Sequence, residues 1–479
     1  MGTGGASLGA AKLYFLLASY ATVLVLTRLL DPATFGSYSA VARLVAVPNM
    51  VIIYTLMFTV SRPLAATYER DTPNYTAIRR RGFRLALLAG GAVSLSFFAG
   101  APIFASLLAD PDLTDAIRVV APISLVYALY AVNVGTINAR RGFTRQAGLD
   151  IFMATAKASL IILAAYLGLG LAHTLGGFTV ASILACALSA WWVRKVRPAA
   201  APNEDAGRPL AGLAGALVLF TMLTNLLLAT DLFVLKHYAI THALKEAVGF
   251  YSGAQYIAQV PYSLLNAMSL LMFPLVATLH ADGESERLRA YVYQAARVIL
   301  VSLGLMGSVA VAAAPSIMAL LFPPSYGVVA EQLRYVVVGY CGYSLVINTA
   351  WMLNSSERAR VAVTLVGVTF GLSALGCVWL GQTYGSAGVA WAVAGAGVVG
   401  GVGALAALRA SFLVTVGWLW MLRLAACVGC VVAVGPMWNP TTKPLIVVQL
   451  CLLTAVFIAT ALGAKVITLE EIRSLRKRG

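Results

Sequence analysis

The sequence is dominated by apolar runs long enough to cross a lipid bilayer as helices. A bilayer core about 30 Å thick takes roughly 20 residues of helix, because each residue adds about 1.5 Å. We place such runs at 7–30, 36–62, 82–108, 116–138, 146–170, 173–193, 210–235, 246–279, 292–321, 330–353, 360–381, 385–408, 412–435 and 444–466. Charged residues make up 11% of the chain, against about 25% in soluble domains. The sequence therefore predicts an all-α membrane protein with about fourteen transmembrane helices.

The short segments between these runs differ in charge from one side of the membrane to the other. Basic residues cluster in one alternate set of segments, as in Arg79–Arg81 and Arg476–Arg478, whereas the other set holds Lys236, Lys245 and Lys443. Because basic segments stay in the cytoplasm, we expect both termini there. The net charge of +16 has the same origin, since basic loops contact anionic lipid head groups. No nucleic-acid partner is expected.

The chain contains an internal repeat. Gly36-Ser-Tyr-Ser39 returns 213 residues later as Gly249-Phe-Tyr-Ser252, and Pro48 returns at Pro261 with the same spacing. Further pairs at this spacing, or at 216 residues beyond the fourth predicted helix, are Arg84 and Arg297, Arg118 and Arg334, Tyr127 and Tyr343, and Asn138 and Asn354. Matches of proline, arginine and asparagine in one register indicate two copies of one structural unit.

The repeat predicts the architecture. Each predicted helix of the first copy corresponds to the helix six places later in the chain. Because six is an even number of membrane crossings, both copies have the same orientation in the membrane. Parallel repeats of this kind build transporters from two lobes that rock about a shared cavity. We expect two parallel six-helix lobes around a central cavity, then two extra C-terminal helices. The expected boundaries are 1–197 for the first lobe, 198–209 for a cytoplasmic linker, 210–409 for the second lobe, 410–466 for the extra helices and 467–479 for a basic cytoplasmic tail.

Pro48 and Pro261 occupy equivalent positions in the second helix of each lobe. A proline inside a helix frees a backbone carbonyl and kinks the helix, which membrane helices tolerate where neighbours or cavity water satisfy that group. We predict that both prolines act as hinges in helices that line the cavity. The alternative is a fixed kink that serves packing.

Several polar and ionisable residues lie deep inside the predicted spans, where an unpaired charge is costly. The candidates are, as cationic substrate-binding residues, Arg28, Arg43, Lys157, Arg297 and Arg423; as acids for ion coupling or internal pairing, Asp150 and Asp231; and as polar cavity lining, Asn49, Asn225 and Gln259. Because cations outnumber acids, we expect an anionic substrate, and the arginine fork suits phosphate and carboxylate oxygens. The alternative is that these charges pair internally and only fasten helices.

Residues 28–39 read Arg-Leu-Leu-Asp-Pro-Ala-Thr-Phe-Gly-Ser-Tyr-Ser. This segment resembles the Arg-x-Leu-Gly-Pro-x-x-Phe-Gly-x-Tyr-Ser signature of polysaccharide-type lipid-linked oligosaccharide flippases, with Asp31 where glycine is usual. Those flippases belong to the multidrug/oligosaccharidyl-lipid/polysaccharide (MOP) exporter superfamily. Their layout of six, six and two helices also resembles the predicted helices. The match carries over Arg28 alone as a cation of the cavity.

The resemblance implies an alternating-access flippase rather than an enzyme. It would move undecaprenyl-pyrophosphate-linked oligosaccharide units to the outer leaflet of a bacterial inner membrane, for lipopolysaccharide or exopolysaccharide export. By analogy with lipid II flippases, spans 412–435 and 444–466 would hold the polyprenyl tail. The implied partners are this substrate, membrane lipids, and polymerase and chain-length proteins of the same pathway. The sequence has no ATP-binding P-loop, so we expect a proton gradient, a sodium gradient or the membrane potential to drive it, with no cofactor and no metal.

Two other functions stay open. An ion-coupled multidrug exporter of the same superfamily would take mostly cationic substrates and would need an acidic cavity. A membrane glycosyltransferase or polymerase is the enzyme alternative. Its motif would be Asp110-Pro-Asp112, because paired aspartates of this form hold a metal and a sugar phosphate. Asp-Pro-Asp is also ordinary turn chemistry, and the chain has no long external segment for a catalytic domain.

Overall fold

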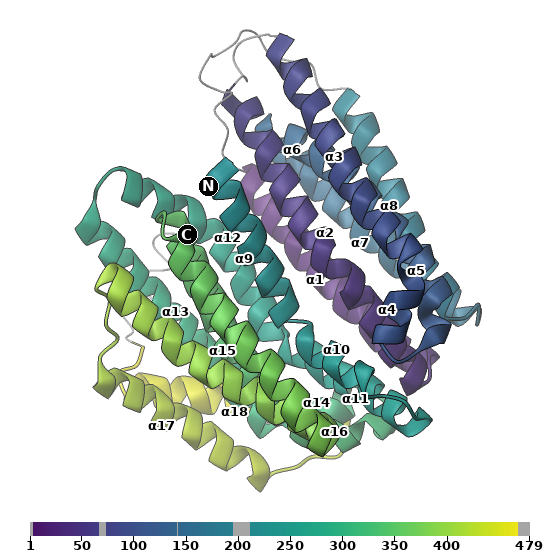
Figure 1. The fold of residues 1–479 in the computed structure, drawn as a ribbon. Coiled ribbons are helices and arrows are strands. Elements are labelled where there is room, and N and C mark those ends of the chain that lie inside the picture. Colours follow the sequence, from purple (N-terminus) through teal and green to yellow (C-terminus); the bar gives the residue numbers. More distant parts are fainter. Residues whose placement is uncertain (1–2, 67–72, 141, 195–210, 468–479) are drawn as a thin grey trace. The chain divides into compact units, whose positions relative to one another are not determined.

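The structure is a computed structural model that describes residues 3–66, 73–140, 142–194 and 211–467. These residues are helical almost throughout and contain no strand (Figure 1), which confirms the predicted all-α membrane fold. The predicted linker 198–209 and residues 468–479 of the predicted tail lie outside the described residues. The chain divides into two compact units, Met1–Gly249 and Phe250–Gly479.

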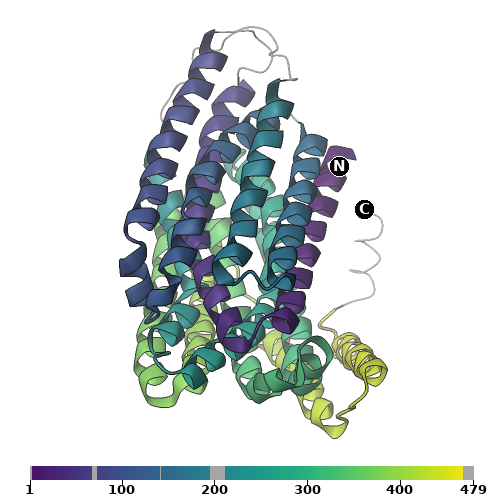
Figure 2. The ribbon, with the colours of Figure 1, turned by 90° about the vertical axis from the view of Figure 1, so that its right-hand side faces the viewer.

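The first unit consists of long helices that lie side by side, with short helices at one end (Figures 1 and 2). Its elements are α1 (Thr3–Leu29), α2 (Pro32–Ala66), α3 (Pro73–Ala99), α4 (Ala101–Leu107), η1 (Pro111–Leu113), α5 (Thr114–Val120), α6 (Pro122–Ala139), α7 (Phe143–Tyr166), α8 (Leu171–Arg194), α9 (Ala211–Leu227) and α10 (Thr230–His237). The helix α11 (His242–Ala258) begins in this unit and continues into the second.

The second unit is likewise helical. Its elements are α12 (Val260–Ala281), α13 (Ser285–Ala312), α14 (Ala314–Leu321), η3 (Pro324–Val329), α15 (Ala330–Ser355), α16 (Ala359–Phe412), α17 (Trp418–Val434), η4 (Gly435–Met437) and α18 (Lys443–Gly463).

Eleven helices of the described residues are long and apolar enough to cross a membrane. The number is twelve if the bent pair Val218–Leu227 and Thr230–His237 forms one span, with an angle of 52° between its halves. The predicted number of fourteen is not confirmed. The chain is nevertheless a multi-pass membrane protein, since large apolar side chains such as Leu88, Leu375 and Trp379 are more than 70% exposed, as lipid-facing residues are.

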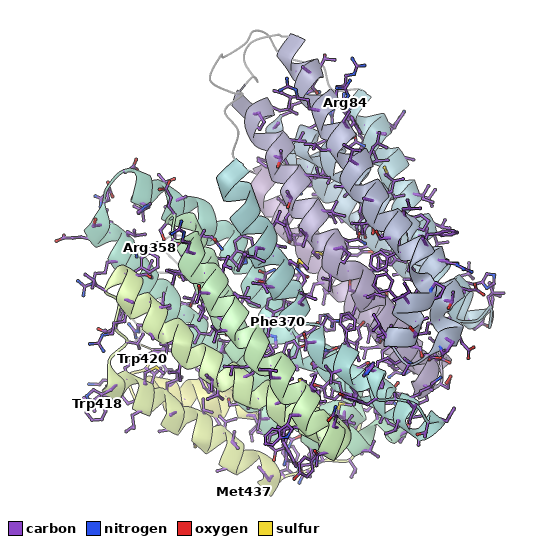
Figure 3. All side chains as sticks on the ribbon, in the orientation of Figure 1. Arg84, Arg358, Phe370, Trp418, Trp420 and Met437 are labelled. Carbon is purple, nitrogen blue, oxygen red and sulfur yellow. The ribbon has the colours of Figure 1, made fainter. Side chains whose placement is uncertain are left out.

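The helix α16 is 54 residues long. A straight helix of that length measures about 80 Å, far more than the apolar thickness of a bilayer. Gly385 interrupts the helix with φ 59° and ψ −136°, a conformation that favours glycine. Beyond this point the chain folds back, because the guanidinium of Arg358 lies 4.9 Å from the ring centroid of Phe412 (Figure 3 labels Arg358). The reversal falls at the predicted boundary between spans 360–381 and 385–408.

Small residues set the spacing between helices within each unit. In the first unit, α3 packs on α6 where a Cβ at Gly90 would lie 2.5 Å from the Cβ of Ala128. In the second unit, a Cβ at Gly342 of α15 would lie 2.0 Å from the carbonyl oxygen of Gly397 of α16. Membrane helices associate through such close backbone contacts, because lipid supplies no hydrophobic force between them.

The two proline positions of the repeat have different local structure. Pro48 lies inside the continuous helix α2. Pro261 lies in the first turn of α12, directly after the interruption at Gln259 that separates α12 from α11. A proline in the first turn needs no backbone hydrogen bond. Their role as hinges stays a prediction.

Candidate functional site

Lys157 is the cation whose surroundings are most informative. It lies near the middle of α7, and its ammonium is 4.0 Å from the ring centroid of Phe178 on α8. Phe178 in turn contacts Tyr127 of α6 edge-on, with ring centroids 5.9 Å apart. Within the described residues, no carboxylate forms an ion pair with Lys157. A cation–π contact compensates only part of the cost of a charge among apolar helices, so this site favours an anion.

Asp150, one of the predicted coupling acids, lies on the same helix and pairs elsewhere. Its carboxylate is 2.8 Å from the ammonium of Lys12 on α1. A hydrogen bond of 2.8 Å between the hydroxyls of Tyr14 and Thr155 joins the same two helices. Asp150 thus joins α1 to α7 through an internal ion pair, and its role in ion coupling stays a prediction.

Two of the predicted cavity cations lie on α1 and α2. Arg28 is exposed at the end of α1 and donates a hydrogen bond to the carbonyl oxygen of Leu24. Arg43 is half-buried on α2. Asp31, which departs from the flippase signature, accepts a hydrogen bond of 3.1 Å from the backbone nitrogen of Thr34 and so caps α2.

Asn49 of α2 is buried, and neither atom of its side-chain amide has a hydrogen-bond partner among the described residues. Asn225 donates to the carbonyl oxygen of Thr221 within α9, at 2.8 Å. Asp231 is buried at the start of α10, beside the bend between α9 and α10, where it accepts a hydrogen bond from the backbone nitrogen of Leu232. Nothing here assigns Asn49, Asn225 or Asp231 a part in binding or coupling, and those roles stay predictions.

The second unit has a neutral polar cluster at the corresponding depth of the repeat. The amide nitrogens of Gln255 and Gln259 donate to the hydroxyl of Tyr340, at 3.0 Å and 3.3 Å. Beside them, the hydroxyl of Tyr343 donates to Ser373 at 2.7 Å. These five side chains connect α11, α15 and α16 and the break before α12 by uncharged hydrogen bonds.

The internal repeat relates this cluster to Lys157. Tyr343 and Ser373 each lie 216 residues after Tyr127 and Lys157, respectively. Equivalent positions thus hold a tyrosine in both units, but the second position is a serine in the second unit and a cation in the first. The asymmetry places positive charge on one repeat of an otherwise similar pair.

The remaining predicted cations lie toward the C-terminal helices. Arg297 of α13 donates to the carbonyl oxygen of Val466 at 2.9 Å and lies 5.2 Å from the ring of Trp420. Trp420, labelled on α17 in Figure 3, donates to the same oxygen at 3.1 Å. Arg423 is exposed on α17. Arg297 therefore ties α13 to the chain that follows α18, and substrate binding by either arginine stays a prediction.

One group of charged residues was missed at the sequence level. The carboxylate of Asp110, in the turn before η1, lies 2.7 Å from the ammonium of Lys236 and 2.9 Å from that of Lys245. The hydroxyl of Ser37 donates to Asp110 at 3.4 Å and accepts a hydrogen bond from Lys236 at 2.9 Å. We call these four residues the lysine–aspartate cluster. The available signal was that Asp110, Lys236 and Lys245 each lie next to the end of a predicted apolar run.

The electrostatics of the cluster favour the charged carboxylate. Burial alone would raise the pKa of Asp110, but hydrogen bonds and charge from Lys236 and Lys245 outweigh it and lower the pKa below its usual value. Asp112, the other acid of the Asp-Pro-Asp turn, is exposed. The two carboxylates thus have different surroundings, and that of Asp110 is occupied by lysines.

Comparison with known proteins agrees with this structure. Residues 25–330 match the family described as "Polysaccharide biosynthesis protein", and no curated protein sequence matches the chain. Among solved structures, the lipid II flippase MurJ in an inward closed conformation is similar with a TM-score of 0.74 and 12% identity, over 96% of this chain and 97% of that one.

Two transporters of the MOP superfamily are similar as well. A multidrug resistance MATE family transporter in an inward-facing conformation has a TM-score of 0.65 and 14% identity, over 87% of this chain and 98% of its own. A transporter from Pyrococcus furiosus, described by the reverse polarity of its binding pocket, has a TM-score of 0.65 and 16% identity, over 88% and 96%. These likenesses show the fold. Since the family match covers more than half of the chain, the protein belongs to this family of polysaccharide biosynthesis proteins and has the fold of the MOP superfamily.

Proposed function

We propose that the protein is a flippase that moves undecaprenyl-pyrophosphate-linked oligosaccharide units from the cytoplasmic to the outer leaflet. The family supports a substrate of polysaccharide biosynthesis, and the fold is one that a lipid II flippase also uses. The observation that carries the proposal is Lys157, a cation in the middle of a membrane helix with an aromatic contact and no carboxylate partner among the described residues.

The chemistry of Lys157 suits such a head group. A pyrophosphate is a dense anion with strong acceptor oxygens, and an ammonium binds it as a point charge. The ammonium lies over the ring of Phe178, which contacts Tyr127 edge-on, so aromatic rings of the kind that suit sugars lie next to this cation. The head group would neutralise Lys157 while the apolar tail stays in the bilayer.

The proposal includes a setting and a source of energy. The protein would work in the inner membrane of a bacterium with both termini in the cytoplasm, as its basic segments indicate. An ion gradient or the membrane potential would drive the alternating-access cycle. Polymerase and chain-length proteins of the same pathway would receive the product.

A multidrug exporter is the second candidate, and the similarity to MATE family transporters favours it. Such an exporter would bind mostly cationic compounds, which an unpaired ammonium repels. The two candidates therefore differ in the effect of the charge at Lys157. Loss of that charge would weaken transport of an anionic head group and would leave export of a cationic drug unchanged or improved.

Proteoliposomes with purified protein and a fluorescent polyprenyl-pyrophosphate oligosaccharide would test the proposal. We expect translocation above lipid-only controls, a loss of about tenfold or more for Lys157→Met, and a partial rescue by Lys157→Arg. Lys443→Gln is the matched control, since Lys443 is an exposed cation at the start of α18. No translocation under any imposed gradient, together with ethidium export by the same vesicles, would establish the multidrug alternative instead.

A further inference from the structure

The lysine–aspartate cluster joins the two copies of the internal repeat at one end of the first unit. Asp110 and Ser37 come from the first copy. Lys236 and Lys245 lie on α10 and at the start of α11, which the register of the repeat assigns to the second copy. The side chain of Lys236 is fully buried, that of Asp110 is 5% exposed, and that of Lys245 is 26% exposed. A contact between His237 Nδ1 and the carbonyl oxygen of Leu107, at 2.6 Å, adds to the same junction.

A second contact between the copies lies next to the cluster. A Cβ at Gly36 of α2 would lie 2.7 Å from the backbone nitrogen of Gly249 of α11 and 3.2 Å from the carbonyl oxygen of Lys245. Conversely, a Cβ at Gly249 would lie 1.8 Å from the carbonyl oxygen of Pro32. Gly36 and Gly249 are repeat equivalents, and so by spacing are Pro32 and Lys245. The contact is therefore self-complementary, like that of a two-fold dimer.

The lysine–aspartate cluster and the contact between Gly36 and Gly249 together describe a closed junction, and they indicate that a partly open junction would be unstable. At the contact between Gly36 and Gly249, which we call the glycine contact, the backbones of α2 and α11 touch, so the helices cannot approach further. In the cluster, Lys236 and Asp110 are buried, Lys245 is partly exposed, and both ammonium groups pair with the one carboxylate. A half-separated cluster would leave charges buried without partners, which costs far more than either full pairing or full hydration. The junction is thus stable when shut, and stable again only when water reaches all of its charges.

We infer that the lysine–aspartate cluster is a latch, which holds α10 and the start of α11 against α2 and the Asp110 turn, and which opens once in each transport cycle. The opening step rests on the proposed transport function, whereas the closure does not. By the charge pattern of the loops, the latch lies at the end of the helices that faces the outside. Opening there would release a bound head group toward the outer leaflet. The lowered pKa of Asp110 agrees with a latch that stays charged at neutral pH.

Hydrogen exchange of the protein in nanodiscs tests the closure without a substrate. Asp110→Asn keeps the shape of the side chain and removes its charge, and Asp112→Asn is the matched control in the same turn, because Asp112 is exposed. We expect about tenfold faster exchange of the amides of 230–249 in Asp110→Asn, with no change in α6. Lys245→Gln should give a smaller increase that Lys245→Arg does not show. Unchanged exchange in 230–249, or an equal increase in α6, would overturn the latch in favour of no role or of general destabilisation.

A reversible cross-link tests the opening. In Asp110→Cys combined with Lys245→Cys, a short bis-methanethiosulfonate linker would replace the ion pair by a covalent bridge, and each single variant corrects for reaction at the six native cysteines. We expect cross-linking to stop translocation of the labelled lipid and reduction to restore it. Continued translocation by cross-linked protein would overturn the latch. If neither the reduced variant nor the wild type transports the labelled lipid, the proposed flippase function fails, while the exchange result still decides whether the junction is a closed latch.

Discussion

The ammonium of Lys12 on α1 lies 2.8 Å from the carboxylate of Asp150 on α7. Lys12 lies near the start of the predicted span 7–30, a position from which an unpaired lysine side chain would extend to the lipid head groups. Asp150 is almost buried, whereas the side chain of Lys12 is 45% exposed. Such a pair holds two helices in register rather than supplying much stability.

A double-mutant cycle measures the contribution of this pair. We expect Asp150→Asn and Lys12→Gln each to lower the thermal unfolding temperature slightly. The double variant should be at least as stable as the less stable of the two single variants. The coupling free energy should be about 1 kcal/mol, because the half-exposed ammonium is screened by solvent. Losses that simply add would show that the two residues act separately.

The glycine contact predicts a strong and local steric effect. Gly249→Ala would push a Cβ into the backbone of Pro32, which cannot give way as a flexible side chain does. We expect little folded protein, measured as monodisperse yield from size-exclusion chromatography in detergent. Gly395→Ala is the control, since nothing lies within 4 Å of a Cβ at that helical position. This control should keep its yield or gain about 0.5–1 kcal/mol of stability.

Acid should weaken the lysine–aspartate cluster. The folded-state pKa of Asp110 is lowered from its usual value of 3.8, so its contribution to stability is present above that value and is lost as the pH falls through the folded-state pKa. The groups that face Asp110 are Lys236, Lys245 and the hydroxyl of Ser37. We expect the difference in thermal stability between wild type and Asp110→Asn to be constant from about pH 7 to pH 5 and to shrink below pH 3.8. A difference that grows on acidification would contradict this assignment.

Arg297 should hold the C-terminal end of the membrane domain in place. Arg297→Gln removes its hydrogen bond to Val466 and its stacking on Trp420, with an expected loss of about 1–2 kcal/mol. Lys should not rescue it, because an ammonium lacks the planar fork that makes both contacts. Faster hydrogen exchange at 461–467 in Arg297→Gln, with no change in α6, is the measurement. Equal exchange in Arg297→Gln and wild type would show that α18 is held by packing alone.

Much of the fold follows from the sequence, because the lengths of the apolar runs and the spacing of the repeat can be read from the sequence directly. The all-α class, the reversal near Gly385 and the superfamily were predicted, and the comparisons and the structure confirm the class and the superfamily. The number of spans was not confirmed. Hydropathy does not show that a run bends, as between α9 and α10, or breaks, as at Gln259.

The partners of the charges were harder to predict, for a physical reason. Arg297 binds a backbone carbonyl 169 residues away, and every residue has such a carbonyl, so no side-chain pattern marks it. Lys236 and Asp110 lie 126 residues apart. Their pairing depends on how the ends of several helices meet, which no single run reveals. Lys157 was found because its depth in one helix is itself the unusual property.

The contact between Gly36 and Gly249 also limits how this duplicated chain can evolve. A duplication ordinarily releases one copy to change while the other keeps the original form. Here the two equivalent residues, Gly36 and Gly249, lie in direct backbone contact, so a methyl group added to either one would collide with the other helix. At this contact, neither copy can gain a larger side chain without displacing the other, so we expect the two copies to differ at other positions.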